Sequence, residues 1–197
     1  MYVLKAQEIM THGPQMHSRT IPLAASALLT TILSAQAGAD VVPDGLRPPA
    51  GEVLALAAHG SGVQIYECKA AKEGSAQFSW TLKAPEAELK DFSGKPLGKH
   101  YAGPTWEAAD GSKVVGEVVA KRDAPDASAI PWLLLRAKST SGTGIFTVIK
   151  SIQRVQTIGG APPANGCDSS QSGKESRVAY SAVYRFYKAP PERAVSP

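Results

Sequence analysis

Hydrophobic and polar residues alternate with a period of two along most of the chain beyond residue 50. This alternation is typical of half-buried β-strands, in which successive side chains point to opposite faces. In the clearest case, segment 176–188, Val178, Tyr180, Ala182, Tyr184 and Phe186 would share one face. β-rich patterns of the same kind occur in segments 62–70, 78–84, 112–123, 131–139 and 144–160.

Turn-forming residues separate these segments. Asp110-Gly111 predicts a tight turn, residues 141–144 divide two strands, and residues 59–62 have the composition of a hairpin loop. Gly116, inside a β-branched run, predicts a bulge. Residues 84–92 fit either a short helical turn or a polar edge strand. Many short strands without helical patterns between them predict an all-β fold, an antiparallel β-sandwich or barrel with long loops.

The first 37 residues have the pattern of a leader and signal peptide. Arg19 precedes an apolar run from Ile21 to Leu33, and Ala35 and Ala37 form a small-x-small cleavage site. A membrane span needs about 20 apolar residues, and this run is shorter. No stable membrane insertion is therefore expected after cleavage. We therefore expect a periplasmic or extracellular protein.

The predicted organisation has four parts. The leader and signal peptide occupy residues 1–37, an extended arm residues 38–50, a single β-rich domain residues 51–188, and a disordered tail residues 189–197. The mature chain would have 197 − 37 = 160 residues, enough for one domain with a substantial core. The formal net charge of +4 is scattered and forms no basic stripe, so no nucleic-acid partner is expected.

The chain contains two cysteines, Cys68 and Cys167. An even number of cysteines in an exported protein predicts a disulfide bond. A metal site is the other possibility, but two distant cysteines without a neighbouring histidine are a poor ligand set. We therefore expect a disulfide and no metal.

Several motifs occur in order along the chain: "VQIYEC", "GPTWEAADGSKV", "IPWLLLRA" and "YSAVYRFY". Together they resemble a family known only as domain of unknown function 3455, over about residues 42–188. The resemblance implies an exported β-rich domain without an established activity. Some fungal relatives carry the label malate dehydrogenase. Ile65 and Thr147 stand where a dinucleotide-binding turn needs its third glycine, and no βαβ pattern occurs. An NAD-dependent enzyme is therefore not expected, and no cofactor is predicted.

The segment "KHYAGPTWEAADGSK", residues 99–113, contains the candidate ligand-binding residues His100, Tyr101, Trp106 and Glu107. In one interpretation His100, Glu107 and Asp110 bind a divalent metal, or Glu107 orients His100 as a general base. In the other, the segment turns the chain and Trp106 closes the core. The second is favoured, because His100 and Glu107 are separated by a proline and their spacing defines no shared geometry.

Three functions are compatible with the sequence. The first is a non-catalytic exported domain that binds a small molecule, a glycan or an envelope partner. The second is a hydrolase-type enzyme that uses the His100–Glu107 loop, and the third is a structural or interaction module. The sequence assigns no catalytic residue and no oligomeric state.

Overall fold

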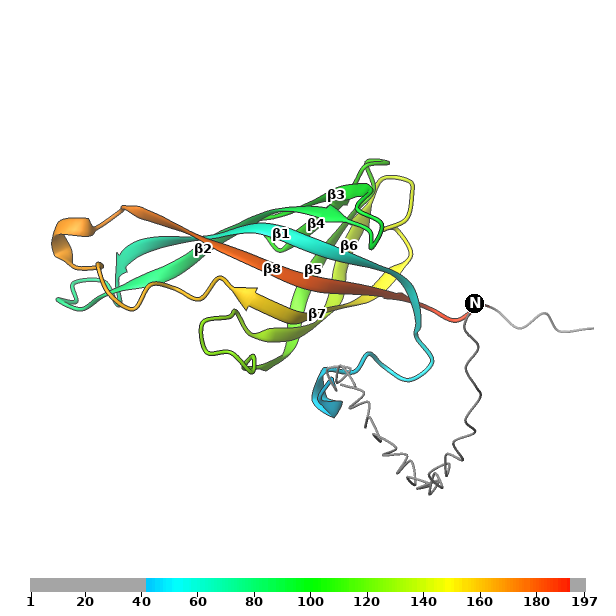
Figure 1. Cartoon of the computed structure of the whole chain (residues 1–197), viewed down its shortest axis with the longest axis horizontal. Helices are drawn as coiled ribbons and strands as arrows, with labels where there is room; N and C mark the ends of the chain where they lie inside the picture. The colour runs from blue at the N-terminus through cyan, green and yellow to red at the C-terminus, as the bar shows by residue number, and fades with distance from the viewer. Residues whose placement is uncertain (1–41, 192–197) are drawn as a thin grey trace, which may run out of the picture. The chain divides into compact units, whose positions relative to one another are not determined.

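Eight antiparallel strands follow one another in chain order around a closed barrel, in which β8 pairs with β1 (Figure 1). The computed structural model describes residues 42–191. The all-β prediction is confirmed, and of the two predicted architectures the chain adopts the barrel. The strands are β1 (Val53–Ala70), β2 (Phe78–Lys90), β3 (Pro96–Tyr101), β4 (Thr105–Ala108), β5 (Lys113–Arg122), β6 (Trp132–Ser141), β7 (Ile149–Gly159) and β8 (Glu175–Lys188).

The main hydrophobic core fills the inside of the barrel. Its largest fully buried side chains are Trp106, Tyr184, Phe146 and Phe186. Residues paired across neighbouring strands point to the same face of a sheet. The register therefore forms an inward-facing row around the barrel, which consists of Tyr180, Gly62, Ala87, His100, Trp106 and Val114.

A second, smaller core lies on the outer face of the barrel. The 3₁₀ helix η1 (Asp44–Leu46) buries Leu46 against a cluster of residues from β6, β7 and β8. The backbone oxygen of Leu46 also accepts a hydrogen bond from Gln153 Nε2, at 2.5 Å. The described part of the predicted arm thus packs against the barrel through this turn. The cluster consists of Trp132, Leu134, Val155 and Val183.

The hairpin loop predicted at residues 59–62 is wrong, because these residues lie within β1. Gly60 is needed there for space: a Cβ atom at this position would lie 2.5 Å from Cε2 of Tyr184. Residues 84–90 belong to β2, so the helical alternative for this segment is also wrong. The predicted bulge is confirmed by a register shift between Val115 and Gly116.

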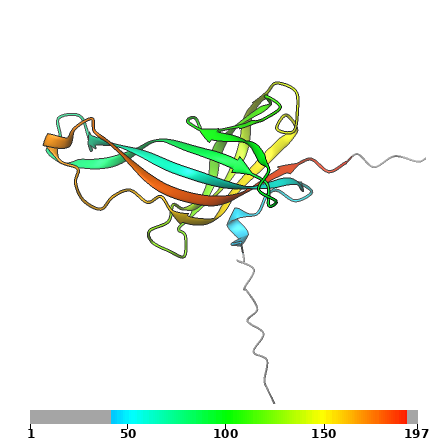
Figure 2. The same ribbon diagram turned by 45° about the horizontal axis from the view of Figure 1, so that its top comes forward.

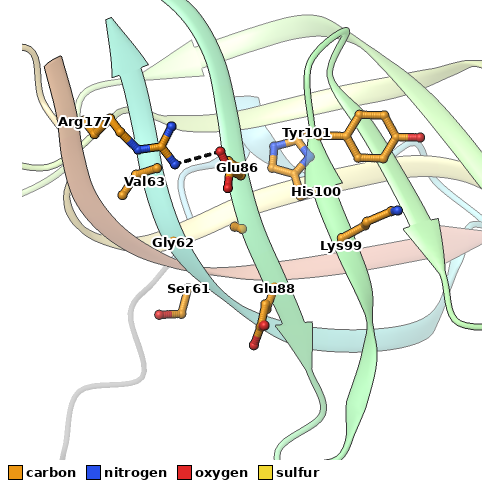
Figure 3. A pocket seen from close by; sticks show the side chains of 10 residues that line it. Ser61, Gly62, Val63, Glu86, Glu88, Lys99, His100, Tyr101 and Arg177 are labelled. Atoms are coloured by element: carbon orange, nitrogen blue, oxygen red, sulfur yellow. Dashed lines mark hydrogen bonds and ion pairs between the residues drawn. The ribbon is translucent and has the colours of Figure 1, made fainter. Parts of the chain in front are cut away.

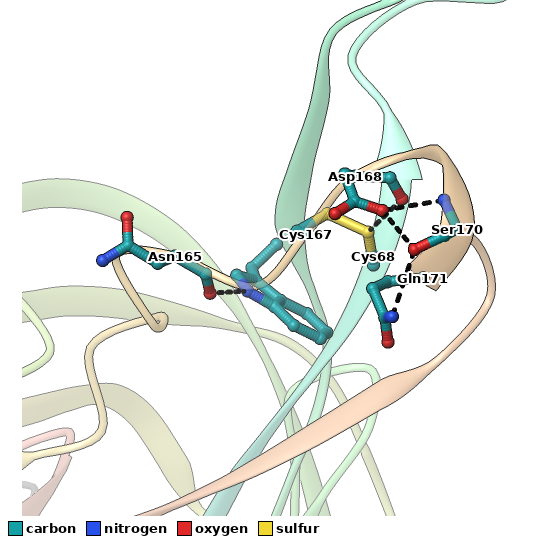
Figure 4. The surroundings of a disulfide bond; sticks show 7 residues. Cys68, Asn165, Cys167, Asp168, Ser170 and Gln171 are labelled. Atoms are coloured by element: carbon teal, nitrogen blue, oxygen red, sulfur yellow. Dashed lines mark hydrogen bonds between the residues drawn. A yellow bond between two sulfur atoms is a disulfide. The ribbon is translucent and has the colours of Figure 1, made fainter.

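The predicted disulfide between Cys68 and Cys167 is confirmed (Figure 4). β1, β2 and β8 extend beyond the barrel body on the left of Figures 1 and 2, and the bond attaches the loop with η2 (Ser169–Gln171) to this end. Trp80 Nε1 donates a hydrogen bond to the backbone oxygen of Asn165 in the same loop, at 2.9 Å. A disulfide typically contributes about 2–4 kcal/mol to stability.

The predicted signal peptide, residues 38–41 of the arm and residues 192–197 of the tail lie outside the described residues. No helix within residues 42–191 has the length and apolar character that a membrane crossing requires.

Candidate functional site

Residues 99–113 form parts of two consecutive hairpins. β3 ends at Tyr101, a turn leads into β4 with Trp106, and a second turn leads into β5. Successive side chains of a strand point to opposite faces. The candidate residues are therefore divided: His100 and Trp106 lie inside the barrel, and Tyr101 and Glu107 lie on its outer face.

His100 is part of the barrel interior, with only 2% of its surface exposed. Its ring stacks on that of Trp106, with centroids 4.3 Å apart and planes inclined by 11°. Nδ1 donates a hydrogen bond to the backbone oxygen of Thr105, at 2.9 Å. Burial lowers the pKa of His100 from 6.5 to about 3, although the bond to Thr105 opposes this shift. A general base needs a pKa near the working pH, so His100 is poorly suited to this role at neutral pH.

Glu107 belongs to a charged cluster on the outer face. Tyr101 donates a hydrogen bond to Glu107 Oε2 at 2.8 Å, and the Nζ atoms of Lys113 and Lys99 lie 3.3 and 3.8 Å from the same oxygen. The hydrogen bond from Tyr101 lowers the pKa of Glu107, and Lys113 acts in the same direction. His100 and Glu107 thus have separate partners on opposite faces, and the structure does not form the acid–base pair of the disfavoured interpretation.

Asp110, the third member of the hypothetical metal ligand set, organises a turn. Its Oδ1 accepts hydrogen bonds from the backbone nitrogen and the hydroxyl group of Ser112, and its Oδ2 accepts one from Ile145 N. Within residues 42–191, no group of three or more His, Cys, Asp or Glu side chains is arranged to hold a metal ion.

An open depression of about 350 Å³ crosses the outer face of β1, β2 and β3 (Figure 3). Its charged residues all have partners of opposite charge. Arg177 pairs with Glu86 at 2.7 Å, and the other two pairs join Glu88 to Lys90 and Lys99 to Glu107. This compensation leaves the depression without a charge of its own that would select a ligand.

The β3–β4 hairpin is shorter than its neighbours and leaves an opening in the barrel wall. β3 pairs with β2 only over residues 87–90, and β4 pairs with β5 only over residues 113–115. In the described part of the chain, residues 78–86 of β2 and 117–122 of β5 therefore have a strand neighbour on one side only. The turn before β4 borders the opening, where Pro104 O accepts a hydrogen bond from Gly116 N.

A pocket of about 290 Å³ extends from this opening into the barrel. Leu82 and Val118 form its mouth and are 52% and 49% exposed. They belong to the two strand segments that have a strand neighbour on one side only. The apolar walls continue inwards with Leu133 and Leu135. The polar residues of the lining are Gln64, Lys83, His100, Trp106 and Arg154.

Arg154 is the cation of the pocket interior. It pairs with Leu133 and Tyr184 in the sheet, which places it on the inner face of β7. Its Nε and Nη2 both donate to Pro131 O, at 3.1 and 2.9 Å. None of the ion pairs among residues 42–191 includes Arg154. The guanidinium group is therefore a positive charge without a carboxylate partner in the described structure.

Among residues 42–191, the surroundings of Arg154 supply no compensating anion. Burial lowers the pKa of the guanidinium group, and the phenol groups of Tyr184 and Tyr180 partly oppose this effect. Burial also raises the pKa of both tyrosines, which therefore stay protonated at neutral pH. Arginine itself remains charged in proteins, because its ordinary pKa lies above 12.

Two further hydrogen-bond donors of the pocket lining are unsatisfied. Gln64 Nε2 and Trp106 Nε1 are buried and have no acceptor among the described residues. An unsatisfied buried donor typically costs about 1–3 kcal/mol. The polar part of the lining is thus rich in donors.

Arg154 and Gln64 were not predicted as site residues from the sequence. The alternation in β7 contained a usable indication, because it places Arg154 on the same face as Ile152, which is fully buried. A charged residue on the apolar face of a strand is uncommon and points to a function or a partner. For Gln64 the corresponding indication is its position between inward-facing Gly62 and Tyr66 in β1.

A family model described as "Protein of unknown function (DUF3455)" matches residues 49–188. The matched range includes all eight strands and every residue that lines the pocket. The resemblance predicted from the sequence motifs is thereby confirmed. No match was found among curated proteins or among solved structures.

Proposed function

Since this chain belongs to the DUF3455 family, whose description names no activity, we propose from its own geometry that it is an exported, non-catalytic barrel that binds a small organic molecule. One observation carries the proposal: the pocket in the barrel wall has mostly apolar walls and a few polar groups in its interior. Small-molecule sites commonly have this composition, and they occur at the mouths of β-barrels.

The size of the pocket limits the size of the ligand. Its volume of about 290 Å³ corresponds to about ten water molecules at about 30 Å³ each. A ligand of about ten non-hydrogen atoms would therefore fill it. The apolar walls favour such a molecule over a glycan, which presents hydroxyl groups on all sides.

The lining supports binding rather than hydrolysis. No serine, threonine or cysteine is among the residues that border the pocket, so a hydroxyl or thiol nucleophile is missing from the described site. His100 is the only histidine of the lining within residues 42–191, and its pKa of about 3 makes it a weak base. These features favour the binding function over the hydrolase alternative.

We expect octanoate or its neutral amide, octanamide, to bind with one-to-one stoichiometry, measured by isothermal titration calorimetry. Val118→Trp should weaken this binding at least tenfold, because the larger side chain would occupy the mouth. Val119→Trp is the matched control: Val119 is similarly exposed, at 52%, but does not line the pocket. Absence of binding, or equal binding by the parent and both variants, would contradict the proposed site.

Export is supported by the predicted signal peptide and by the disulfide, since such bonds persist in oxidising compartments. We expect protein recovered from outside the cytoplasm to begin at Gly38, which N-terminal sequencing would determine. An intact leader on soluble cytoplasmic protein would contradict this expectation.

A further inference from the structure

We propose that the ligand is a small organic carboxylate, whose charged group contacts Arg154 and whose apolar body lies against Leu82, Val118 and Leu133. This inference rests on the proposed function of the pocket and specifies the chemical class of its ligand. It follows from three features of the lining: its charge, its free donors and its apolar walls.

The charge of the lining is unbalanced. In the described part of the chain, Arg154 and Lys83 are its two cations, and no aspartate or glutamate lines it. Lys83 forms an ion pair with Glu175 at 2.6 Å, so its charge is already compensated. Arg154 remains as one uncompensated charge, which a ligand with a single negative charge would neutralise.

The donor groups of the lining also match a carboxylate. A guanidinium group carries five N–H groups, of which Nε supplies one and each Nη two. The contacts to Pro131 use one from Nε and one from Nη2, and they hold the plane of the group in place. The phenol group of Tyr184 is a further hydrogen-bond partner of the guanidinium group, so two N–H groups remain for a ligand among residues 42–191. Arginine binds carboxylates strongly because its donors match the two oxygens.

The apolar walls explain why the anion should be organic. Leu82 and Val118 expose much of their surface at the mouth, and burial of such surface by a ligand is favourable. A simple inorganic anion would leave these walls in contact with water. A phosphate group would carry more than one negative charge, whereas the pocket interior offers a single free cation among the described residues.

The test compares octanoate with octanamide and octylamine, which share an apolar chain and differ in the charge of the head group. We expect octanoate to bind the parent about ten to one hundred times more tightly than octanamide, because hydrogen bonds between charged groups are the strong ones. Octylamine should bind most weakly. Acetate and inorganic phosphate should both bind at least tenfold more weakly than octanoate, because neither has the apolar chain.

Arg154→Gln should remove the preference for octanoate over octanamide, and Arg154→Lys should retain part of it. If octanamide binds the parent as tightly as octanoate, and Val118→Trp weakens both, the carboxylate inference is wrong while the proposed binding function stands. Binding of phosphate as tight as that of octanoate would also overturn the carboxylate inference. If octanoate, octanamide and octylamine all fail to bind, both proposals are wrong. The comparison of probes on the parent decides the question even if a substitution at Arg154 prevents folding.

Discussion

Replacement of Trp106 by alanine should lower the free energy of unfolding by about 3–5 kcal/mol, as truncation of a buried aromatic side chain usually does. Trp106 is 1% exposed and lies at the centre of the barrel core. It stacks on His100, and the rings of Tyr184 and Phe186 contact it in edge-to-face geometry. Gly116 provides the space for its ring, since a Cβ atom there would lie 2.9 Å from Cζ3 of Trp106. The substitution would remove all of these contacts together.

Urea unfolding followed by circular dichroism would measure this effect. Trp80→Ala is a matched control with the same chemical change, because Trp80 is only partly buried and lies near the disulfide loop. We expect Trp80→Ala to cost clearly less than Trp106→Ala. If the two variants lose the same stability, or if Trp106→Ala unfolds like the parent, Trp106 is not the central core residue described above.

Acidification should destabilise the barrel by about 4–5 kcal/mol through His100 alone. The pKa of this residue is about 3 in the folded protein, compared with an ordinary value of 6.5. Between these two pH values the unfolded chain binds a proton at His100 that the folded chain does not bind. The stabilising contribution is therefore complete above about pH 6.5 and is lost progressively as the pH falls towards 3. A difference of one pKa unit corresponds to about 1.4 kcal/mol, which gives the stated size.

His100→Gln should reduce this pH dependence, because glutamine does not titrate and can still donate a hydrogen bond to Thr105. The experiment compares the free energy of unfolding at about pH 7 and about pH 4 for parent and variant. His59→Gln serves as the control, since His59 is exposed and lies beside Phe92. An unchanged pH dependence in His100→Gln would show that folding does not lower the pKa of His100.

β3 and β4 were not predicted as strands, because segment 99–113 was interpreted as a turn of the chain. The other six strands were predictable, at least in part, because local alternation marks them, as in β8. Closure of the barrel was not, because it depends on the pairing of β1 with β8 from opposite ends of the domain, which no local pattern encodes. The glycines of β1 show the same limit. Gly60 and Gly62 resemble a turn in sequence, but in the barrel they provide space for Tyr184 and for the backbone of β2.

One part of the candidate site was predictable from the sequence, and the other part was not. His100 and Trp106 were found because the segment between the two turns is rich in aromatic and polar residues. Their separation from Tyr101 and Glu107 follows from strand alternation, which requires the exact strand boundaries. Arg154 lies in a distant strand, and only the closed barrel brings it to the same pocket as His100.

The short β3–β4 hairpin also affects how the protein behaves at high concentration. Unpaired strand edges can pair with another chain, and this is a common route to aggregation. The open segment of β2 carries Lys83 and Pro85, and that of β5 ends in Lys121 and Arg122. Proline has no N–H group to donate to an added strand, and the side chains of Lys121 and Arg122 repel their counterparts when the β5 edges of two copies approach. The barrel wall can therefore stay open without offering a template for edge-to-edge self-association.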